Sequence, residues 1–312
     1  MKEEFEKLYD KLNEKNKSIL QQIYKDAMIE KKKRRMLIIK YTVIPTIIIY
    51  IVQIILMFKK KMPNITLISW WTMLAVIVSV VIIKKNSINY IKYKRKIKNN
   101  IIFNLIKNFF NNVDYIPNKE ISNEIYNEAG FKNYNRYYAD DYIEAYIKQN
   151  EIIMSNVKTE IETTDSDGDS KTVVTFNGLF VKIKFNKSIN DKIKICNYKY
   201  KNKENINLDS QDFEEMFDVS ANDNIKVMQL LTSDVMELLI KFSKFINSKF
   251  DISIIENNIY IRIDNNISFE ANLAENNIID KKQMKKYYDT LHFVYNLSLY
   301  LIKWIEESYI TE

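Results

Sequence analysis

The sequence predicts a membrane-anchored α+β protein, in which a transmembrane helical hairpin precedes a mostly antiparallel sheet domain with flanking helices. Three observations predict this fold class. Residues 41–58 and 65–83 are apolar runs without a charged residue, and only the KKKMPN segment separates them. Residues 142–263 contain several segments rich in Ile, Val, Thr, Tyr and Phe, which are typical of strands. Amphipathic patterns of helical period lie before the runs and after the strand-rich region.

Each apolar run is long enough to cross a bilayer. As a helix, each run would span about 27–29 Å, close to the ~30 Å hydrocarbon core of a membrane. A buried soluble helix or strand rarely continues for that length without a charge. Pro45 does not oppose this interpretation, because proline is tolerated in membrane helices. We therefore expect two membrane crossings within residues 36–83.

The basic residues beside these runs predict their orientation. No acidic residue occurs from position 31 to 112, so the net charge of +7 is concentrated there and the rest of the chain is acidic. The positive-inside rule then places both termini in the cytoplasm of a multi-pass inner-membrane or plasma-membrane protein. We expect the flanking cations to lie at anionic lipid headgroups, and we expect no nucleic-acid binding by the acidic remainder. These membrane-surface residues are Lys31, Lys32, Lys33, Arg34, Arg35, Lys84 and Lys85.

The remaining elements follow from local patterns. Residues 1–35 are predicted to be helical, with a break near Asn16, and residues 86–111 to continue the second membrane helix. Helices are also predicted at 118–129, 232–248 and 281–309, where apolar residues recur on one face. Strands are predicted within 142–160, at 171–176, 179–185, 193–198 and 225–229, and as a hairpin of 251–255 and 259–263 that turns at Glu256.

These elements divide the chain into four predicted parts. Residues 1–35 form a cytosolic helical segment, 36–83 the transmembrane hairpin, 84–112 a juxtamembrane basic helix, and 113–312 a cytosolic α+β domain. About 200 residues are ample for one hydrophobic core. The single cysteine, Cys196, cannot form an intrachain disulfide and fits a reducing compartment.

An ordered series of short segments resembles a known family. The series contains Tyr115-Ile-Pro, then YADDYIEAY at 138–146, FNGLF at 176–180, DSQDFEEMF at 209–217, and NIYIRI at 258–263. Together with the two-helix anchor, this order is similar to the bacterial membrane family called domain of unknown function 3137. The resemblance covers roughly residues 85–310. It implies an architecture of membrane anchor plus cytosolic domain, and it brings no established activity and no catalytic residues.

The residue inventory removes most kinds of active site. One histidine and one cysteine exclude the usual zinc motifs, and three scattered glycines do not make a phosphate-binding loop. His292 is expected on the flank of a helix and Cys196 as a packed thiol in a strand. Asp165, Asp167 and Asp169 resemble the start of a calcium loop, but Ser170 and Phe176 occupy the positions that need Gly and Glu. We expect no cofactor and no bound metal.

The sequence leaves three functions open. The first is a membrane-anchored cytosolic binding or scaffold module that holds a protein or small ligand near the bilayer. The alternative is a membrane-tethered hydrolase or transferase that uses the acidic cluster Asp140, Asp141 and Glu144 as acid and base. The second alternative is an accessory subunit of a transporter or channel. The scarcity of histidine, cysteine and glycine motifs favours the first function. Its protein partner is unknown, and self-association is left open.

Overall fold

The computed structural model describes residues 2–58, 65–164, 168–198, 206, 208–266 and 280–308. The chain divides into two compact units. Unit 1 comprises Met1–Asn100 with Glu270–Asp280, and unit 2 comprises Ile101–Phe269 with Lys281–Glu312. Because these units are separate bodies, the helices of the first and the sheet of the second are considered in turn.

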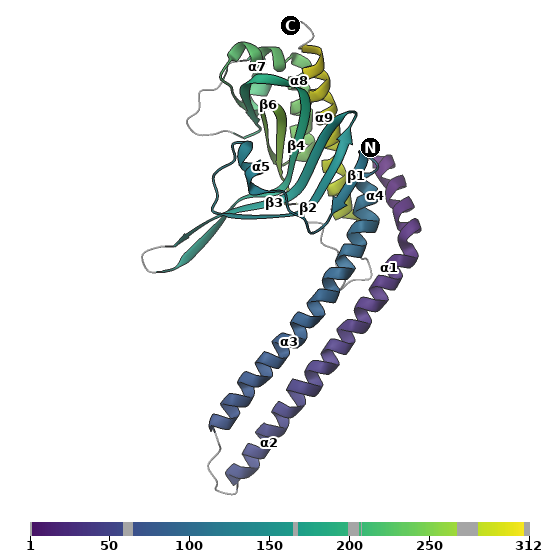
Figure 1. Cartoon of the computed structure of the whole chain (residues 1–312), viewed down its shortest axis with the longest axis vertical. Coiled ribbons are helices and arrows are strands. Elements are labelled where there is room, and N and C mark those ends of the chain that lie inside the picture. Colours follow the sequence, from purple (N-terminus) through teal and green to yellow (C-terminus); the bar gives the residue numbers. More distant parts are fainter. Residues whose placement is uncertain are drawn as a thin grey trace. The chain divides into compact units, whose positions relative to one another are not determined.

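Unit 1 is built from long helices (Figure 1). Helix α1 (Lys2–Ile38) continues through a π-helical turn η1 (Ile39–Val43) into α2 (Ile44–Phe58), and α1 packs along α3 (Ile65–Ile97). The predicted break near Asn16 is wrong, because its side-chain amide donates to the carbonyl oxygen of Leu12 at 2.8 Å within an uninterrupted helix. The wider turn η1 ends two residues before Pro45, whose ring nitrogen cannot donate the hydrogen bond that an α-helix needs there.

The apolar runs lie on these helices with their side chains exposed. Ile48 on α2 is 54% exposed, and Val76 and Val81 on α3 are 62% and 60% exposed. Among the described residues, one helix, Glu3–Val52, is long and apolar enough to cross a membrane, and Thr72–Ile82 is a shorter apolar helix. The membrane crossing of the first run and that of the second therefore both stay predictions. The basic positions Lys31 to Arg35 belong to α1, and Lys84 and Lys85 belong to α3.

Unit 2 begins where the chain turns from helix to sheet. A π-helical turn η2 (Lys98–Ile102) and α4 (Phe103–Ile106) end the helical region, and β1 (Asn111–Ile116) begins the sheet. The juxtamembrane helix predicted to extend to residue 112 therefore ends at Ile106. Phe109 and Phe110 fill this turn and pack against Tyr295, with ring centroids 6.1 and 5.7 Å away.

Across the described part of unit 2, six strands form one antiparallel sheet. β1, β2 (Arg136–Ile147), β3 (Asn150–Thr164) and β4 (Ser170–Cys196) follow in order, and β4 also pairs with β5 (Asp218–Ser220) and β6 (Lys249–Asp264). The predicted strand pattern of 142–160 is split into β2 and β3, because the chain reverses at Lys148, where φ is +54°. The segments predicted as separate strands at 171–176, 179–185 and 193–198 belong to the long strand β4, except that β4 ends at Cys196.

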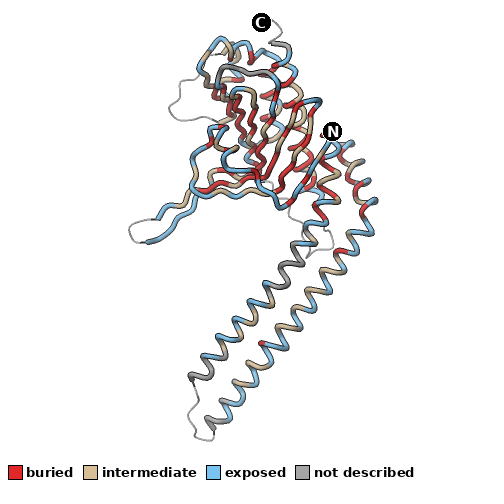
Figure 2. Tube along the Cα trace, in the orientation of Figure 1, coloured by how far each residue is buried: buried red, intermediate tan, exposed pale blue. Residues whose placement is uncertain are grey.

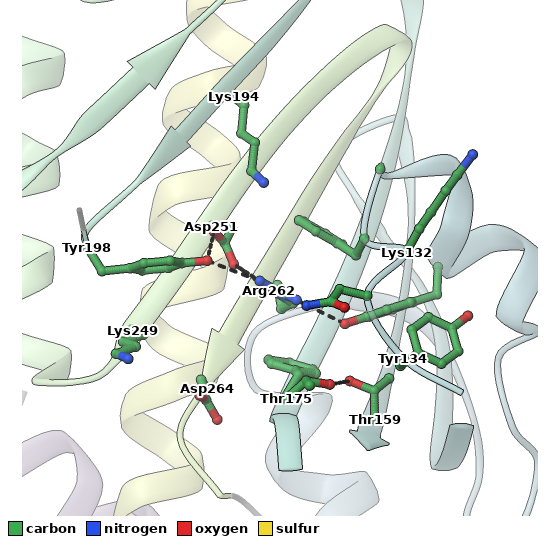
Figure 3. A pocket seen from close by; sticks show the side chains of 15 residues that line it. Lys132, Tyr134, Thr159, Thr175, Lys194, Tyr198, Lys249, Asp251, Arg262 and Asp264 are labelled. Carbon is green, nitrogen blue, oxygen red and sulfur yellow. Dashed lines mark hydrogen bonds and ion pairs between the residues drawn. The ribbon is translucent and has the colours of Figure 1, made fainter. Parts of the chain in front are cut away.

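Strand β6 doubles back on itself. Asp251 and Arg262 are in contact, although eleven residues of straight strand would separate them by roughly 35 Å. The bend lies at Glu256, where φ is +53°. The two short strands predicted as a hairpin are therefore one bent strand, and β4 follows the same bend, since residues 179–184 pair with one half of β6 and 192–196 with the other. Figure 3 shows the ribbon of β6 bending back.

Helices cover the sheet. α8 (Ser233–Ile246) and α9 (Lys281–Ser308) pack together and α9 also contacts β2 and β4. Of the predicted helices, 118–129 is reduced to α5 (Asn123–Glu128), whose first turn is capped by the Ser122 hydroxyl. The strand predicted at 225–229 is wrong: it is α7 (Asn224–Leu230), because Asp223 caps that turn by accepting from two backbone N–H groups. α6 (Gln211–Met216) completes the set in the described ranges.

Alternation along β6 supplies a core on each face of the sheet. Ile259, Ile261 and Ile263 are fully buried on one face, and Phe250 and Phe293 pack edge to face with ring centroids 5.5 Å apart. Tyr260 points to the other face, where it belongs to a cluster with Tyr126 of α5. Figure 2 shows buried residues concentrated along the strands of unit 2. The described helices therefore do not all share one core, and the α5 side carries the more polar one.

Candidate functional site

A pocket of about 390 Å³ opens on the α5 side of the sheet (Figure 3). We call it the Arg262 pocket. Its walls come from the connection between α5 and β2, from both halves of β4, and from both ends of β6. The residues that line it are Tyr126, Gly130, Phe131, Lys132, Asn133, Tyr134, Thr159, Thr175, Phe176, Lys194, Tyr198, Lys249, Asp251, Arg262 and Asp264.

Local chain geometry explains why these residues meet. The reversal of β6 at Glu256 places Asp251 beside Arg262, and β4 follows the same bend, which brings Thr175 and Lys194 to one region. On the α5 side, Gly130 ends the helix with φ at +84°, a conformation that a side chain disfavours. The chain then turns so that Phe131 packs on Tyr126, with ring centroids 5.6 Å apart.

Arg262 is held at the floor of the pocket by four hydrogen-bonded contacts. Its Nε donates to Asp251 Oδ2 at 2.7 Å, and its Nη2 forms an ion pair with the same oxygen at 2.5 Å. Nη1 donates to the Tyr126 hydroxyl at 3.2 Å, and Nη2 donates to the Tyr198 hydroxyl at 3.1 Å. The Tyr198 hydroxyl in turn donates to Asp251 Oδ1 at 2.5 Å. Both oxygens of Asp251 are therefore occupied, and the guanidinium is fixed in one plane.

Burial and charge act in opposite directions on this network. Burial disfavours the charged guanidinium and lowers the pKa of Arg262, but Asp251, Tyr126 and Tyr198 outweigh that effect, so the pKa is raised. Burial likewise raises the pKa of Tyr126, against the opposing influence of Arg262. Arg262 thus stays cationic and Tyr126 stays neutral at physiological pH.

Aromatic rings and ammonium groups surround this floor. The Arg262 guanidinium lies over Phe131 and Phe176, at 4.2 and 5.1 Å from their ring centroids. The Lys194 ammonium is 5.4 Å from the centroid of Phe131, and the Lys249 ammonium is 5.5 Å from that of Tyr198. Figure 3 shows Lys194 extending toward Asp251 and Lys132 extending away at the rim. The arrangement combines positive charge with flat apolar walls.

The acidic cluster predicted from the sequence has a different setting. Asp141 is 1% exposed and has φ at +58°, where β2 shifts register against β3. Its Oδ1 accepts from the Tyr115 hydroxyl at 2.6 Å and its Oδ2 accepts from Asn156 Nδ2 at 3.1 Å. Burial, followed by the charge of Asp141, raises the pKa of Tyr115 well above its ordinary value.

The other two carboxylates of that cluster point elsewhere. Glu144 is partly buried and accepts from the Tyr142 hydroxyl at 3.2 Å, and burial together with Glu144 raises the pKa of Tyr142 to about 12. Asp140 lines a second, shallow pocket of about 350 Å³, with Tyr138, Asn156 and Asn266 among its other walls. The three carboxylates therefore have three separate environments, and a catalytic role for them stays a prediction.

The remaining sequence-predicted groups lie in packed or undescribed regions. Cys196 is buried, its thiol donates to the Asp218 carbonyl oxygen at 3.6 Å, and burial raises its pKa to about 12. His292 lies partly buried on α9 beside Tyr288, with ring centroids 6.1 Å apart. Asp165 and Asp167 of the calcium-like loop lie outside the described residues. Within the described ranges, no three His, Cys, Asp or Glu side chains are placed to hold a metal ion.

Sequence reasoning did not identify the Arg262 pocket. Arg262 is the single arginine within the NIYIRI segment, and an arginine in an alternating apolar strand is a visible sign of a buried charge that needs a partner. Its partner Asp251 lies in the other half of β6, and only the bend at Glu256 brings the two together. The aromatic residues from α5 carry no comparable signal.

Comparisons with known proteins confirm the predicted family resemblance. A family model described as "Protein of unknown function (DUF3137)" matches residues 174–301. The match covers β4 from Val174, all of β6 and most of α9, and so contains the β4 and β6 residues that line the Arg262 pocket, while Thr159, the α5 side and the apolar helices of unit 1 lie outside it. No curated protein matches the chain.

One solved structure shows a distant likeness. It is the crystal structure of the mycobacterial trehalose monomycolate transport factor A, TtfA, with 7% identity and a TM-score of 0.36. The alignment covers 65% of this chain and 93% of that chain. At this score the likeness carries no argument about function.

Proposed function

We propose that this chain is a membrane-anchored binding module whose α+β unit holds a small ligand in the Arg262 pocket. The observation that carries the proposal is the preformed floor of that pocket. Arg262, Asp251 and Tyr198 fix one another in a concave site, and pockets of about 300–1,000 Å³ with few well-placed polar groups are typical of small-molecule binding. A rigid floor lowers the entropic cost of binding.

The exposed apolar helices support the anchoring part of the proposal. Soluble surfaces rarely expose contiguous apolar patches, yet α2 presents Ile47, Ile51 and Ile54 at 52%, 51% and 50% exposure. Lipid tails would cover these side chains. We propose two crossings at 41–58 and 65–83, with both termini in the cytoplasm and the basic residues 31–35 at anionic headgroups.

Ligand retention tests the binding function. The full chain is purified in nanodiscs and its bound small molecules are identified by native mass spectrometry. Lys249→Trp fills the mouth of the pocket, and Lys184→Trp is the matched control, because Lys184 is also exposed and lies on β4 outside the lining. We expect a small molecule on the wild type and the control but not on Lys249→Trp. Equal retention by all three proteins would refute the assignment of the pocket.

Thiol labelling tests the topology. Single cysteines are placed at Glu3, Asn64 and Glu312 in a Cys196→Ala background, and intact cells are treated with a membrane-impermeant maleimide. We expect labelling at position 64 alone, because the positive-inside rule places that loop outside. Labelling of either terminus on intact cells would contradict the proposed orientation, and permeabilised cells show that every site is reactive.

A further inference from the structure

We infer that the ligand of the Arg262 pocket is a small phosphate monoester carried on a planar aromatic body. This inference rests on the proposed binding function and names the chemistry of its ligand. Its first basis is the charge of the lining, in which four cationic side chains accompany two carboxylates among the described residues. The cations are Lys132, Lys194, Lys249 and Arg262, and the carboxylates are Asp251 and Asp264.

The two carboxylates are already engaged by the protein. Asp251 accepts from Tyr198 at one oxygen and from Arg262 at the other. Asp264 Oδ1 accepts from the backbone N–H of Asn177 at 3.2 Å. Their charges are thus partly satisfied within the fold, whereas Lys132 and Lys249 are exposed at the rim. The site therefore attracts an anion more strongly than a neutral or cationic molecule.

The second basis is the presentation of the aromatic walls. The Tyr134 hydroxyl donates to Asn127 Oδ1 at 2.9 Å, and the Tyr198 hydroxyl donates to Asp251. Because both polar ends are tied to the protein, these tyrosines offer a ligand mainly the faces of their rings. Stacking of a planar base on such a ring is worth roughly 1–3 kcal/mol per base.

The charge of the lining and the exposed ring faces together select one class of ligand. A flat body would stack on the tyrosine rings, and its phosphate would lie toward the ammonium groups of Lys194 and Lys249. Lysine recognises phosphate as a compact point charge. A pocket of about 390 Å³ has room for a ligand of nucleoside monophosphate size. A phospholipid headgroup shares the phosphate but lacks the planar body, so the pocket favours a free solute.

A matched ligand series tests the inference on the full chain in phosphatidylcholine nanodiscs. Calorimetry measures adenosine monophosphate, adenosine, and inorganic phosphate as probes. We expect the monophosphate to bind at least about tenfold tighter than adenosine or phosphate alone, and to weaken several-fold between about 50 and 300 mM NaCl as charges are screened. Equal binding of adenosine and its monophosphate would overturn the inference.

Paired lysine variants locate the effect. Lys194→Gln with Lys249→Gln should weaken monophosphate binding by about tenfold. Lys171→Gln with Lys184→Gln removes the same charge from exposed positions outside the lining and should change binding less than about twofold. Equal losses in the two double variants would show non-specific attraction and overturn the inference.

Two further outcomes separate the inference from the proposed function. If no monophosphate binds while a small molecule is still retained by wild type and lost in Lys249→Trp, the ligand class is wrong and the binding function stands. If nanodiscs with phosphatidic acid compete with the monophosphate by more than about fivefold, the phosphate comes from a lipid headgroup and the aromatic part of the inference fails. Weaker competition supports a free solute.

Discussion

Two buried carboxylates on the same sheet differ in their access to solvent and in their partners. Asp141 on β2 accepts hydrogen bonds from Tyr115 and Asn156 and is sealed at 1% exposure. Asp251 on β6 accepts from Tyr198 and is paired with Arg262, at the floor of an open pocket. Each accepts from a tyrosine hydroxyl, but Asp251 also forms an ion pair with an arginine and lines a cavity.

The difference shows why acidic residues in a sequence are a poor guide to a site. Asp140 and Asp141 are adjacent, yet a register shift in β2 sends one toward a shallow surface pocket and the other into the interior. Asp251 and Arg262 are far apart in sequence, yet the reversal of β6 joins them. Chain geometry, more than sequence proximity, decides which charges meet.

The largest expected effect comes from Gly178, which lies between the two sites. It pairs with Val157, next to Asn156, and a Cβ built on it would lie 1.9 Å from the carbonyl oxygen of Ile263, next to Arg262. Gly178→Ala must push β4 and β6 apart, so we expect a loss of about 3 kcal/mol or more in the free energy of unfolding. Urea unfolding measures it. Gly168→Ala is the comparison for backbone strain alone, because its φ is +87° but nothing lies within 4 Å of its Cβ, and we expect it to cost only about 1 kcal/mol.

Arg262→Met should cause the next largest loss in the free energy of unfolding. The substitution leaves Asp251, whose side chain is 3% exposed, as a buried charge without its ion pair, and we expect a loss of about 3 kcal/mol. Adding Asp251→Asn removes that charge, so the double variant should be more stable than Arg262→Met alone. A double-mutant cycle from urea unfolding measures the coupling. If the two losses simply add, the pair is not the organising contact of the pocket.

Tyr115→Phe should cost less, because it removes the hydrogen bond from the tyrosine hydroxyl to Asp141 and leaves the packed volume of the ring nearly unchanged. We expect a loss of about 1–2 kcal/mol in unfolding free energy. Tyr138→Phe is the control, since Tyr138 is 49% exposed and should change stability by less than about 0.5 kcal/mol. If Tyr115→Phe leaves the free energy of unfolding unchanged, the hydrogen bond to Asp141 does not hold β1 to the sheet.

Much of the fold was predictable from the sequence, and the pocket was not. Apolar periodicity located α8 and α9, and β-rich composition located β2, β3 and β6. The same composition misled at 225–229, because Val227 and Leu230 are also suited to a buried helix face and the Asp223 cap decides the outcome. The pocket depends on long-range contacts between α5, β4 and β6, and no local pattern encodes the meeting of Tyr126 with Arg262.

The smallest expected effect is a pH dependence from Cys196. The pKa of its thiol is raised to about 12, so the folded state favours the neutral thiol, whereas the unfolded thiol ionises near its ordinary value of 9. Its contribution is complete below pH 9 and is lost as the pH rises from about 9 to 12. Above about pH 9 the unfolding free energy of wild type should therefore fall more steeply with rising pH than that of Cys196→Ala, because the unfolded thiol ionises while the folded thiol stays neutral. Identical slopes in urea unfolding would contradict the raised pKa.

The pairing of β4 along the whole of the bent strand β6 has a consequence for synthesis. β4 leaves the ribosome before β6, so the edges that will receive β6 stay without their partner until residues 249–264 have emerged. Unpaired strand edges are templates for pairing with other chains. Assembly of the sheet therefore waits on a late segment, whereas the helices of unit 1 form from local contacts as they appear. During translation, the helices of unit 1 can therefore form before the sheet of unit 2 is complete.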